Sequence, residues 1–156
     1  MKFSELKGRA VINLEDASKV GEVEDLLVEQ QSRRIVSLKV RTGLFSASKL
    51  VPATDIRNVG ADAVTISVGT AKESTESSPP LVELTTILGN KVVTDAGTFV
   101  GDLHDILLDW TNLAITGYEV RESGLFASTQ EFAASAEVSF GKKMITIPAQ
   151  LLAQPK

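Results

Sequence analysis

The chain repeats itself at an offset of about 80 residues, and this duplication limits its possible folds more than any other feature. The longest match sets Val20–Leu27 (VGEVEDLL) on Val100–Leu107 (VGDLHDIL). Shorter matches follow in the same order along both copies: Gly8–Ile12 on Gly89–Val93, Val40-Arg41 on Val120-Arg121, Gly43–Phe45 on Gly124–Phe126, and Gly60–Ile66 on Gly141–Ile147. Because the matches need only two single-residue gaps, they indicate a duplicated unit rather than chance similarity.

The segment between the copies differs in composition from both. Residues 70–80 (TAKESTESSPP) are polar, hold no large apolar side chain and end in two prolines. Such a segment cannot bury enough surface to offset the entropy of ordering it. We therefore predict units at 1–69 and 81–150, a linker at 70–80 and a tail at 151–156. A unit of about 65 residues buries only about 60% of its unfolded surface, so we expect the two units to pack on each other.

Each unit consists of short apolar runs that are typical of strands. Val, Ile and Leu recur in runs bounded by Gly, Asp and Asn, which favours strands over helices. Several short strands with regular turns predict an all-β fold of two small antiparallel β-barrels in tandem. The predicted strands are Ala10–Leu14, Gly21–Glu29, Ile35–Arg41 and Val64–Val68 in the first unit, and Lys91–Thr94, Gly101–Asp109, Ile115–Arg121 and Met144–Ile147 in the second.

The order of these features resembles the PRC-barrel family. The resemblance rests on an opening Leu-x-Gly (Leu6-Lys7-Gly8), a V-G-x-V-x-D strand within Ala17–Val28, and a strand ending in Val-Arg at Ile35–Arg41. It implies a small antiparallel β-barrel that serves as a binding module. One member of this family is the cytoplasmic domain of the H subunit of photosynthetic reaction centres, and another is the C-terminal domain of a ribosome maturation factor. The second copy departs from the pattern where Phe132-Ala133-Ala134 lacks the proline of Val51-Pro52-Ala53.

Charge is distributed unequally between the two halves. Residues 1–72 carry 11 Lys and Arg against 9 Asp and Glu, a net +2, whereas residues 73–156 carry 5 against 11, a net −6. An acidic half repels phosphate backbones, so we do not expect nucleic-acid binding. An RNA- or ribosome-associated factor remains an alternative, which the family resemblance suggests. The basic clusters available for it are Arg33-Arg34 and Lys39-Arg41, with Lys142-Lys143 in the other unit.

The N-terminus and the hydropathy of the chain indicate a cytoplasmic location. No apolar run approaches the roughly 20 residues that cross a bilayer, and Met1–Lys7 has charges where a signal peptide needs its apolar segment. We therefore expect no membrane insertion.

Residue types that carry chemistry are scarce. The chain has no cysteine and one histidine, His104, which alternates along a predicted strand and lacks a second histidine to complete a metal site. No serine lies in a Gly-x-Ser-x-Gly turn, and no phosphate-binding glycine loop is present. We therefore predict no catalytic residue, no metal and no cofactor. An enzyme or small-ligand binder that uses the cleft between the barrels remains an alternative.

Charged residues that recur in both copies predict structural contacts. With hairpin turns near Gln31 and Thr111, the second and third predicted strands place Glu22 opposite Arg41, and Asp102 opposite Arg121, as structural ion pairs. Asp25 and Asp105 lie in otherwise apolar strands. A carboxylate there needs hydrogen-bond partners, so we interpret these two acids as structural rather than as a catalytic pair.

Three apolar positions are candidates for contact with a partner. Leu44-Phe45 and Leu125-Phe126 follow single glycines where turns are expected, and Trp110 lies at a hairpin tip. Aromatic and large aliphatic side chains are more often buried than exposed, so each Leu-Phe pair is expected to pack into its own barrel. If the pairs are exposed, they mark a contact surface. The leading interpretation is a non-catalytic adaptor or assembly module with a protein partner, acting as a monomer or a homodimer.

Overall fold

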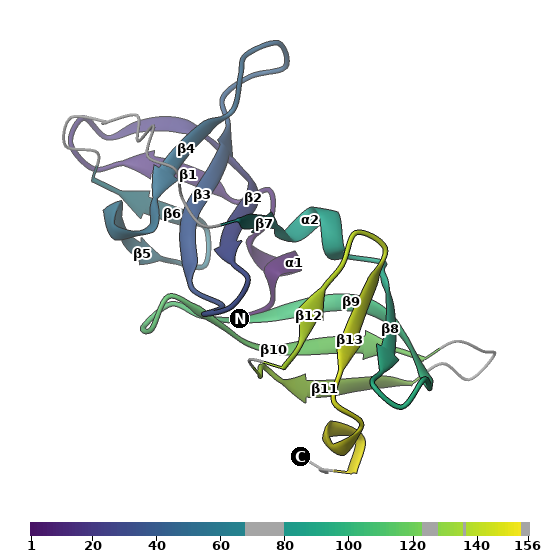
Figure 1. Cartoon of the computed structure of the whole chain (residues 1–156). Helices are drawn as coiled ribbons and strands as arrows, with labels where there is room; N and C mark the ends of the chain where they lie inside the picture. Colours follow the sequence, from purple (N-terminus) through teal and green to yellow (C-terminus); the bar gives the residue numbers. More distant parts are fainter. Residues whose placement is uncertain (68–79, 123–127, 136, 154–156) are drawn as a thin grey trace.

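The computed structural model describes residues 1–67, 80–122, 128–135 and 137–153, and it shows a mostly β protein with two separate sheets packed on each other (Figure 1). The predicted linker therefore lies outside the described residues, apart from Pro80. Within the described part, no helix has both the length and the apolar character that a membrane crossing requires.

The first sheet contains the strands of the N-terminal repeat. A short helix, α1 (Phe3–Leu6), precedes β1 (Ala10–Asn13), β2 (Ser18–Glu29), β3 (Ile35–Arg41) and β4 (Lys49–Pro52). A 3-10 turn, η1 (Ala53–Asp55), then leads to β5 (Ile56–Val59) and β6 (Ala63–Ile66). The strand order is β4-β3-β2-β1-β6-β5. The predicted bounds of β3 are confirmed, and those of β1, β2 and β6 differ by at most three residues.

The second sheet repeats the same plan. β7 (Leu81–Glu83) and α2 (Leu84–Ile87) precede β8 (Lys91–Thr94), β9 (Phe99–Asp109) and β10 (Ala114–Arg121). β11 (Thr129–Ala133), β12 (Ser139–Phe140) and β13 (Met144–Ile147) complete the sheet, and η2 (Ala149–Ala153) follows. The order β11-β10-β9-β8-β13-β12 matches that of the first sheet strand for strand. Although the second copy lacks the proline of the first, β11 still forms and buries Phe132.

One strand pair in each sheet departs from the expected antiparallel arrangement. β1 pairs with β6, and β8 with β13, in parallel, whereas the other neighbouring strands are antiparallel. The direction is set by the route of the chain: it crosses from the β4 or β11 edge to the opposite edge, makes a hairpin there, and returns alongside its first strand. A run of apolar residues does not encode strand direction, so the pattern of residues could not predict this pairing.

The Val-Gly motif of both repeats marks a place where two backbones approach too closely for a side chain. A Cβ atom added to Gly21 would lie 2.0 Å from the carbonyl oxygen of Arg41, and one added to Gly101 would lie 2.2 Å from that of Arg121. The register between β1 and β2 shifts beside this point, as it does between β8 and β9. Glycine is therefore required here by space, beside a bulge that bends the strand.

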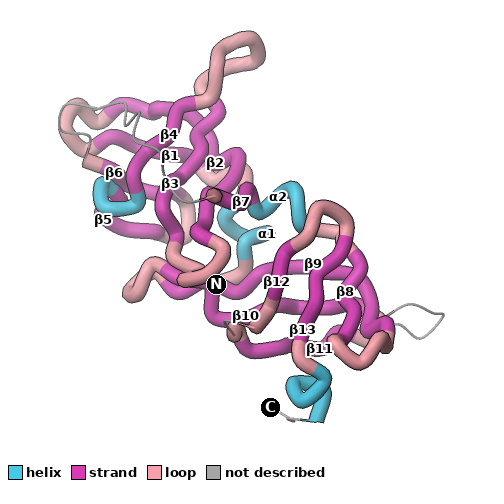
Figure 2. Tube along the Cα trace, in the orientation of Figure 1, coloured by secondary structure: helices cyan, strands magenta, loops and turns pink. Residues whose placement is uncertain are grey.

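The first residues of each repeat pair with a strand in the sheet of the other repeat. β7, which opens the second repeat, pairs antiparallel with the end of β2, aligning Val82 with Val28. At the start of the first repeat, Lys2 forms a bridge with Leu107 of β9, and the Leu108 N–H donates to the Met1 carbonyl oxygen at 2.8 Å. Figures 1 and 2 place α1 and α2 between the two sheets. The apolar residues of these helices, Phe3, Leu6, Leu84 and Ile87, are at most 3% exposed and belong to one continuous core.

A third contact lies where the two repeats meet midway along the chain. Arg34 and Ala114, which are equivalent residues at an offset of 80, form a bridge with each other. The Ile35 N–H donates to the Leu113 carbonyl oxygen at 2.7 Å, and the Ile115 N–H donates to that of Arg33 at 2.9 Å. Because equivalent residues meet in both directions, the repeats are related by an approximate two-fold axis. The predicted packing of the two units on each other is confirmed.

Candidate contact surface and the interface between the repeats

The hairpin between β3 and β4 carries an exposed apolar pair. The exposed fraction is 91% for Leu44 and 101% for Phe45. The expectation that this pair packs into its own barrel was wrong. The ladder between β3 and β4 ends at Val40 and Lys49, and the hairpin continues beyond it into solvent (Figure 1), so the core is out of reach. Leu125 and Phe126, the corresponding pair in the second repeat, lie outside the described residues.

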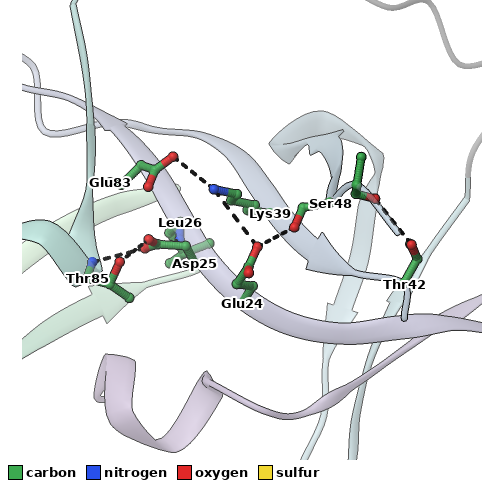
Figure 3. Close-up of polar contacts among 9 residues, drawn as sticks. Glu24, Asp25, Leu26, Lys39, Thr42, Ser48, Glu83 and Thr85 are labelled. Atoms are coloured by element: carbon green, nitrogen blue, oxygen red, sulfur yellow. Dashed lines mark hydrogen bonds and ion pairs between the residues drawn. The ribbon is translucent and has the colours of Figure 1, made fainter. Parts of the chain in front are cut away.

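Polar contacts fix the base of this hairpin (residues 42–48). The Ser48 hydroxyl donates to a carboxylate oxygen of Glu24 at 2.5 Å, and the Thr42 hydroxyl donates to the carbonyl oxygen of Ala47 at 3.3 Å (Figure 3). Glu24 comes from β2, so the hairpin is tied to a strand of the sheet that it leaves. The apolar tip is thus presented from an anchored base.

Trp110, the third candidate for partner contact, lies at the interface between the repeats instead of on an open surface. It follows the end of β9, is half-buried, and packs against the core. Its indole N–H points to the sulfur of Met1 at 3.2 Å. The tryptophan of the second repeat therefore covers the first residue of the first repeat.

The recurring acids Asp25 and Asp105 clasp the two repeats together. The Thr85 N–H donates to Asp25 Oδ1 at 3.1 Å, and the Thr85 hydroxyl donates to Oδ2 (Figure 3). Ser4 makes the same pair of bonds to Asp105, with its N–H at 3.1 Å from Oδ1. Each acid also accepts from the backbone N–H of the next residue in its own strand, at 2.8 Å for Asp25 and 2.9 Å for Asp105.

These bonds explain how two carboxylates lie in apolar strands. Asp25 is 2% exposed and Asp105 is 3% exposed, and a buried charge of this kind is tolerated only where hydrogen bonds replace water. The residues that supply them, on α1 and α2, come from the opposite repeat. The prediction that the acids need hydrogen-bond donors is confirmed, whereas the identity of the donors was missed. The available signal was that a hydroxyl residue, Ser4 or Thr85, occupies the same place in both copies.

The predicted ion pairs have different outcomes in the two repeats. Glu22 aligns with Arg41 as predicted, and Arg41 Nη2 lies 3.8 Å from Glu22 Oε2. The Lys19 ammonium, 3.0 Å from Glu22 Oε1, is the main reason that the pKa of Glu22 falls below its ordinary value, with Arg41 as a smaller contribution.

Asp102 also aligns with Arg121 in the ladder, as predicted. The predicted ion pair was wrong, since no contact within 4.0 Å joins the charged groups of these two described residues. Arg121 Nη2 instead lies 3.5 Å from Nε2 of His104. His104 is exposed.

A second set of charges surrounds each clasp, with opposite signs in the two repeats. Near Asp25, Lys39 Nζ lies 3.1 Å from Glu83 and 3.9 Å from Glu24 (Figure 3). Its hydrogen bond to Glu83 is the main cause of a raised Lys39 pKa.

Near Asp105 the arrangement is reversed: the acid lies on the strand β10 and the base directly precedes the helix α1. Lys2 Nζ lies 2.8 Å from the carboxylate of Glu119, and His104 Nε2 lies 3.8 Å from the same carboxylate. The hydrogen bond to Glu119 raises the pKa of Lys2. The Glu119 side chain is only 8% exposed, and the Lys2 ammonium is its nearest cationic partner.

Two shallow grooves lie on the second repeat. One, of about 490 Å³, runs between β7, α2 and the β12–β13 turn, and is lined by Val82, Ile87 and Phe140 among others. The other, of about 370 Å³, lies between β13 and η2 beside Asp95 and Glu137. Over the part of the chain that the structure describes, no three His, Cys, Asp or Glu side chains are grouped closely enough to hold a metal ion.

Comparison with known proteins supports the fold of the first repeat. Residues 1–72 match the sequence model of the PRC-barrel domain, and no curated protein matches the chain. The second repeat has the same strand order by structure, without a family match of its own. Residues 1–72 thus form a PRC-barrel domain, and a second β-sheet domain packs against it.

Proposed function

We propose that the protein is a non-catalytic module that binds a protein partner through the hairpin of residues 42–48. The observation that carries this proposal is the exposure of Leu44 and Phe45, 91% and 101% respectively. Two large apolar side chains in water do not stabilise the fold. Burying each of them against another surface would be favourable by about 1.5–3 kcal/mol.

The neighbouring strand extends the apolar surface. β4 is an edge strand of the first sheet, and Leu50 within it is 58% exposed. An open edge with apolar side chains is a template for pairing with another chain, and extended segments commonly add to such edges. The corresponding edge strand of the second repeat, β11, exposes Thr129, Gln130 and Ala133 instead. The first repeat is therefore the better candidate for contact with a partner.

Aromatic anchors carry much of the energy of small protein interfaces, so Phe45 is the residue to test. Full-length tagged chains, either native or carrying both Leu44→Ser and Phe45→Ser, are used to capture partners from the native host's lysate. The captured proteins are then identified by mass spectrometry. We expect the native chain to retain a defined protein at moderate salt and the double variant to lose it.

A matched control distinguishes this surface from general stickiness. Phe99 is also exposed, at 64%, and it lies in the second repeat with the Lys91 ammonium 5.8 Å from its ring. Phe99→Ser should leave capture unchanged. Capture that ignores both hairpin substitutions would contradict the proposed contact. Material that disappears with salt and with nuclease would instead support the RNA-associated alternative.

A further inference from the structure

The interface between the repeats contains two ion pairs that are equivalent in position and reversed in sign. Lys2 of the first repeat corresponds to Glu83 of the second, since both directly precede the short helices α1 and α2. Lys39 on β3 corresponds to Glu119 on β10, since both directly precede the Val-Arg pair that ends the strand. Lys2 meets Glu119 at 2.8 Å, and Glu83 meets Lys39 at 3.1 Å. Each pair joins one repeat to the other.

We infer that these reversed pairs make each repeat a specific partner for the unlike repeat and a poor partner for a copy of itself. A first repeat paired with another first repeat would place Lys2 against Lys39 at both contacts. A second repeat paired with another second repeat would place Glu83 against Glu119 at both contacts. Like charges in contact are unfavourable, and specificity between similar surfaces commonly depends on such repulsion.

The clasps and the first apolar residue of each helix are compatible with either partner. Asp25 and Asp105 each accept from a hydroxyl and a backbone N–H, and Ser4 could replace Thr85 without loss of a bond. The apolar residues at the first position of each helix, Phe3 and Leu84, are both fully buried. Since both repeats make the same clasp and bury an apolar residue at the start of the helix, the reversed charges are the difference that would repel a like partner. Of these charges, Glu119 is the most buried, so repulsion at this position is screened least by solvent.

Single substitutions in the full-length chain reproduce each like contact. Glu83→Lys places an ammonium against Lys39, as a pair of first repeats would. Lys2→Glu places a carboxylate against Glu119, as a pair of second repeats would. We expect each to lower Tm by about 5 °C at low salt, and by less in 1 M salt, where the Debye length falls to about 3 Å. The restoring doubles, Glu83→Lys with Lys39→Glu and Lys2→Glu with Glu119→Lys, should recover at least half of each loss.

Controls separate this coupling from the effect of net charge. Lys49→Glu changes the net charge as Lys39→Glu does, at an exposed position of β4 that has no ion pair within the described residues, and it should neither lower Tm comparably nor be rescued by Glu83→Lys. If a charge reversal prevents folding, the neutral cycle of Lys39→Gln with Glu83→Gln replaces it. In that cycle, the second substitution should lower Tm by less than the same substitution does in the native chain. Double-mutant losses that equal the sum of the single losses at either pair would overturn the inference.

Discussion

The two repeats share their backbone contacts and differ in what fills equivalent positions. Both have the same strand order, and in both a buried aspartate accepts hydrogen bonds from the helix of the other repeat. They differ at Lys39 and Glu119, where the charge is reversed. They also differ in the core, where fully buried Leu38 of β3 corresponds to Tyr118 of β10. The comparison indicates that the shared residues hold the pair together, while the differing residues give each half its own role.

The strongest test of the shared contacts is to remove the apolar anchor of an exchanged helix. Phe3 has no exposed surface and lies between its own repeat and β9 of the other. Phe3→Ala should lower the free energy of unfolding by about 4 kcal/mol, as large truncations in a core do. Urea unfolding with circular dichroism measures this loss. Phe99→Ala, at an exposed phenylalanine, should change it by less than about 0.5 kcal/mol. Equal losses for the two variants would contradict a shared core.

The clasps should contribute the next largest effect, and it should be similar in the two halves. Asp25→Ala leaves the N–H groups of Leu26 and Thr85 without their acceptor, which should cost about 2–3 kcal/mol. Asp105→Ala should cost about as much, because Ser4 makes the same contacts there. The measurement is again chemical denaturation, with Asp25→Asn as the comparison variant, since an amide oxygen can still accept. A loss below about 1 kcal/mol for both alanine variants would show that the clasps are dispensable.

Local features of this fold could be predicted from the sequence. The apolar run within Ile35–Arg41 predicted a strand with the observed bounds, and the length of the hairpin fixed the alignment of Glu22 with Arg41. Duplication predicted two sheets with one plan. These predictions succeed because strand period and hairpin length act over a few residues.

The exchange of segments between repeats could not be predicted in this way. Phe3 and Leu6 lie three apart, which indicates a buried helical turn but not the sheet that buries it. Docking on the same repeat or on the other one would satisfy the pattern equally. The exposure of Leu44 and Phe45 was missed for a related reason, because general frequencies of burial do not show where a hairpin leaves its sheet. The strands β7 and β12 have only three and two residues, which is too few for a periodic pattern, and the polar residues Arg57 and Asn58 interrupt the apolar pattern of β5.

Tyr118 allows a direct test of the difference between the two cores. Its hydroxyl is buried with no hydrogen-bond partner among the described residues, and its ring meets Phe140 edge-on at 5.7 Å. Tyr118→Phe removes an unsatisfied polar group and keeps the ring, so it should raise the free energy of unfolding at pH 7 by up to about 1 kcal/mol. Leu38→Ala in the other core should lower it, because a cavity forms there.

The same substitution should change stability at alkaline pH. Burial raises the pKa of Tyr118 above its ordinary value of 10.0. The unfolded chain therefore ionises at a lower pH than the folded one, and stability that is complete below about pH 10 is lost as pH rises further. Tyr118→Phe should remove this part of the loss. Lys39, whose pKa is also raised, loses its ion pair as pH rises, which lowers stability in the same direction. Because Lys39 is present in both chains, the difference between their profiles reports on Tyr118. Identical stability profiles of the native and variant chains above pH 10 would contradict burial of the phenol.

The smallest effect is expected at the hairpin, and its size matters to the proposed function. Phe45 is fully exposed and Leu44 nearly so, so Phe45→Ser should leave the free energy of unfolding within about 0.5 kcal/mol of the native value. Calorimetry on the isolated chain measures this directly. A residue that is neutral for folding yet required for capture acts through a partner, whereas a loss of stability at this position would mean that the hairpin packs on its own sheet. The contrast with Phe3 is then complete, since one phenylalanine stabilises the pair of repeats and the other is available for contact outside it.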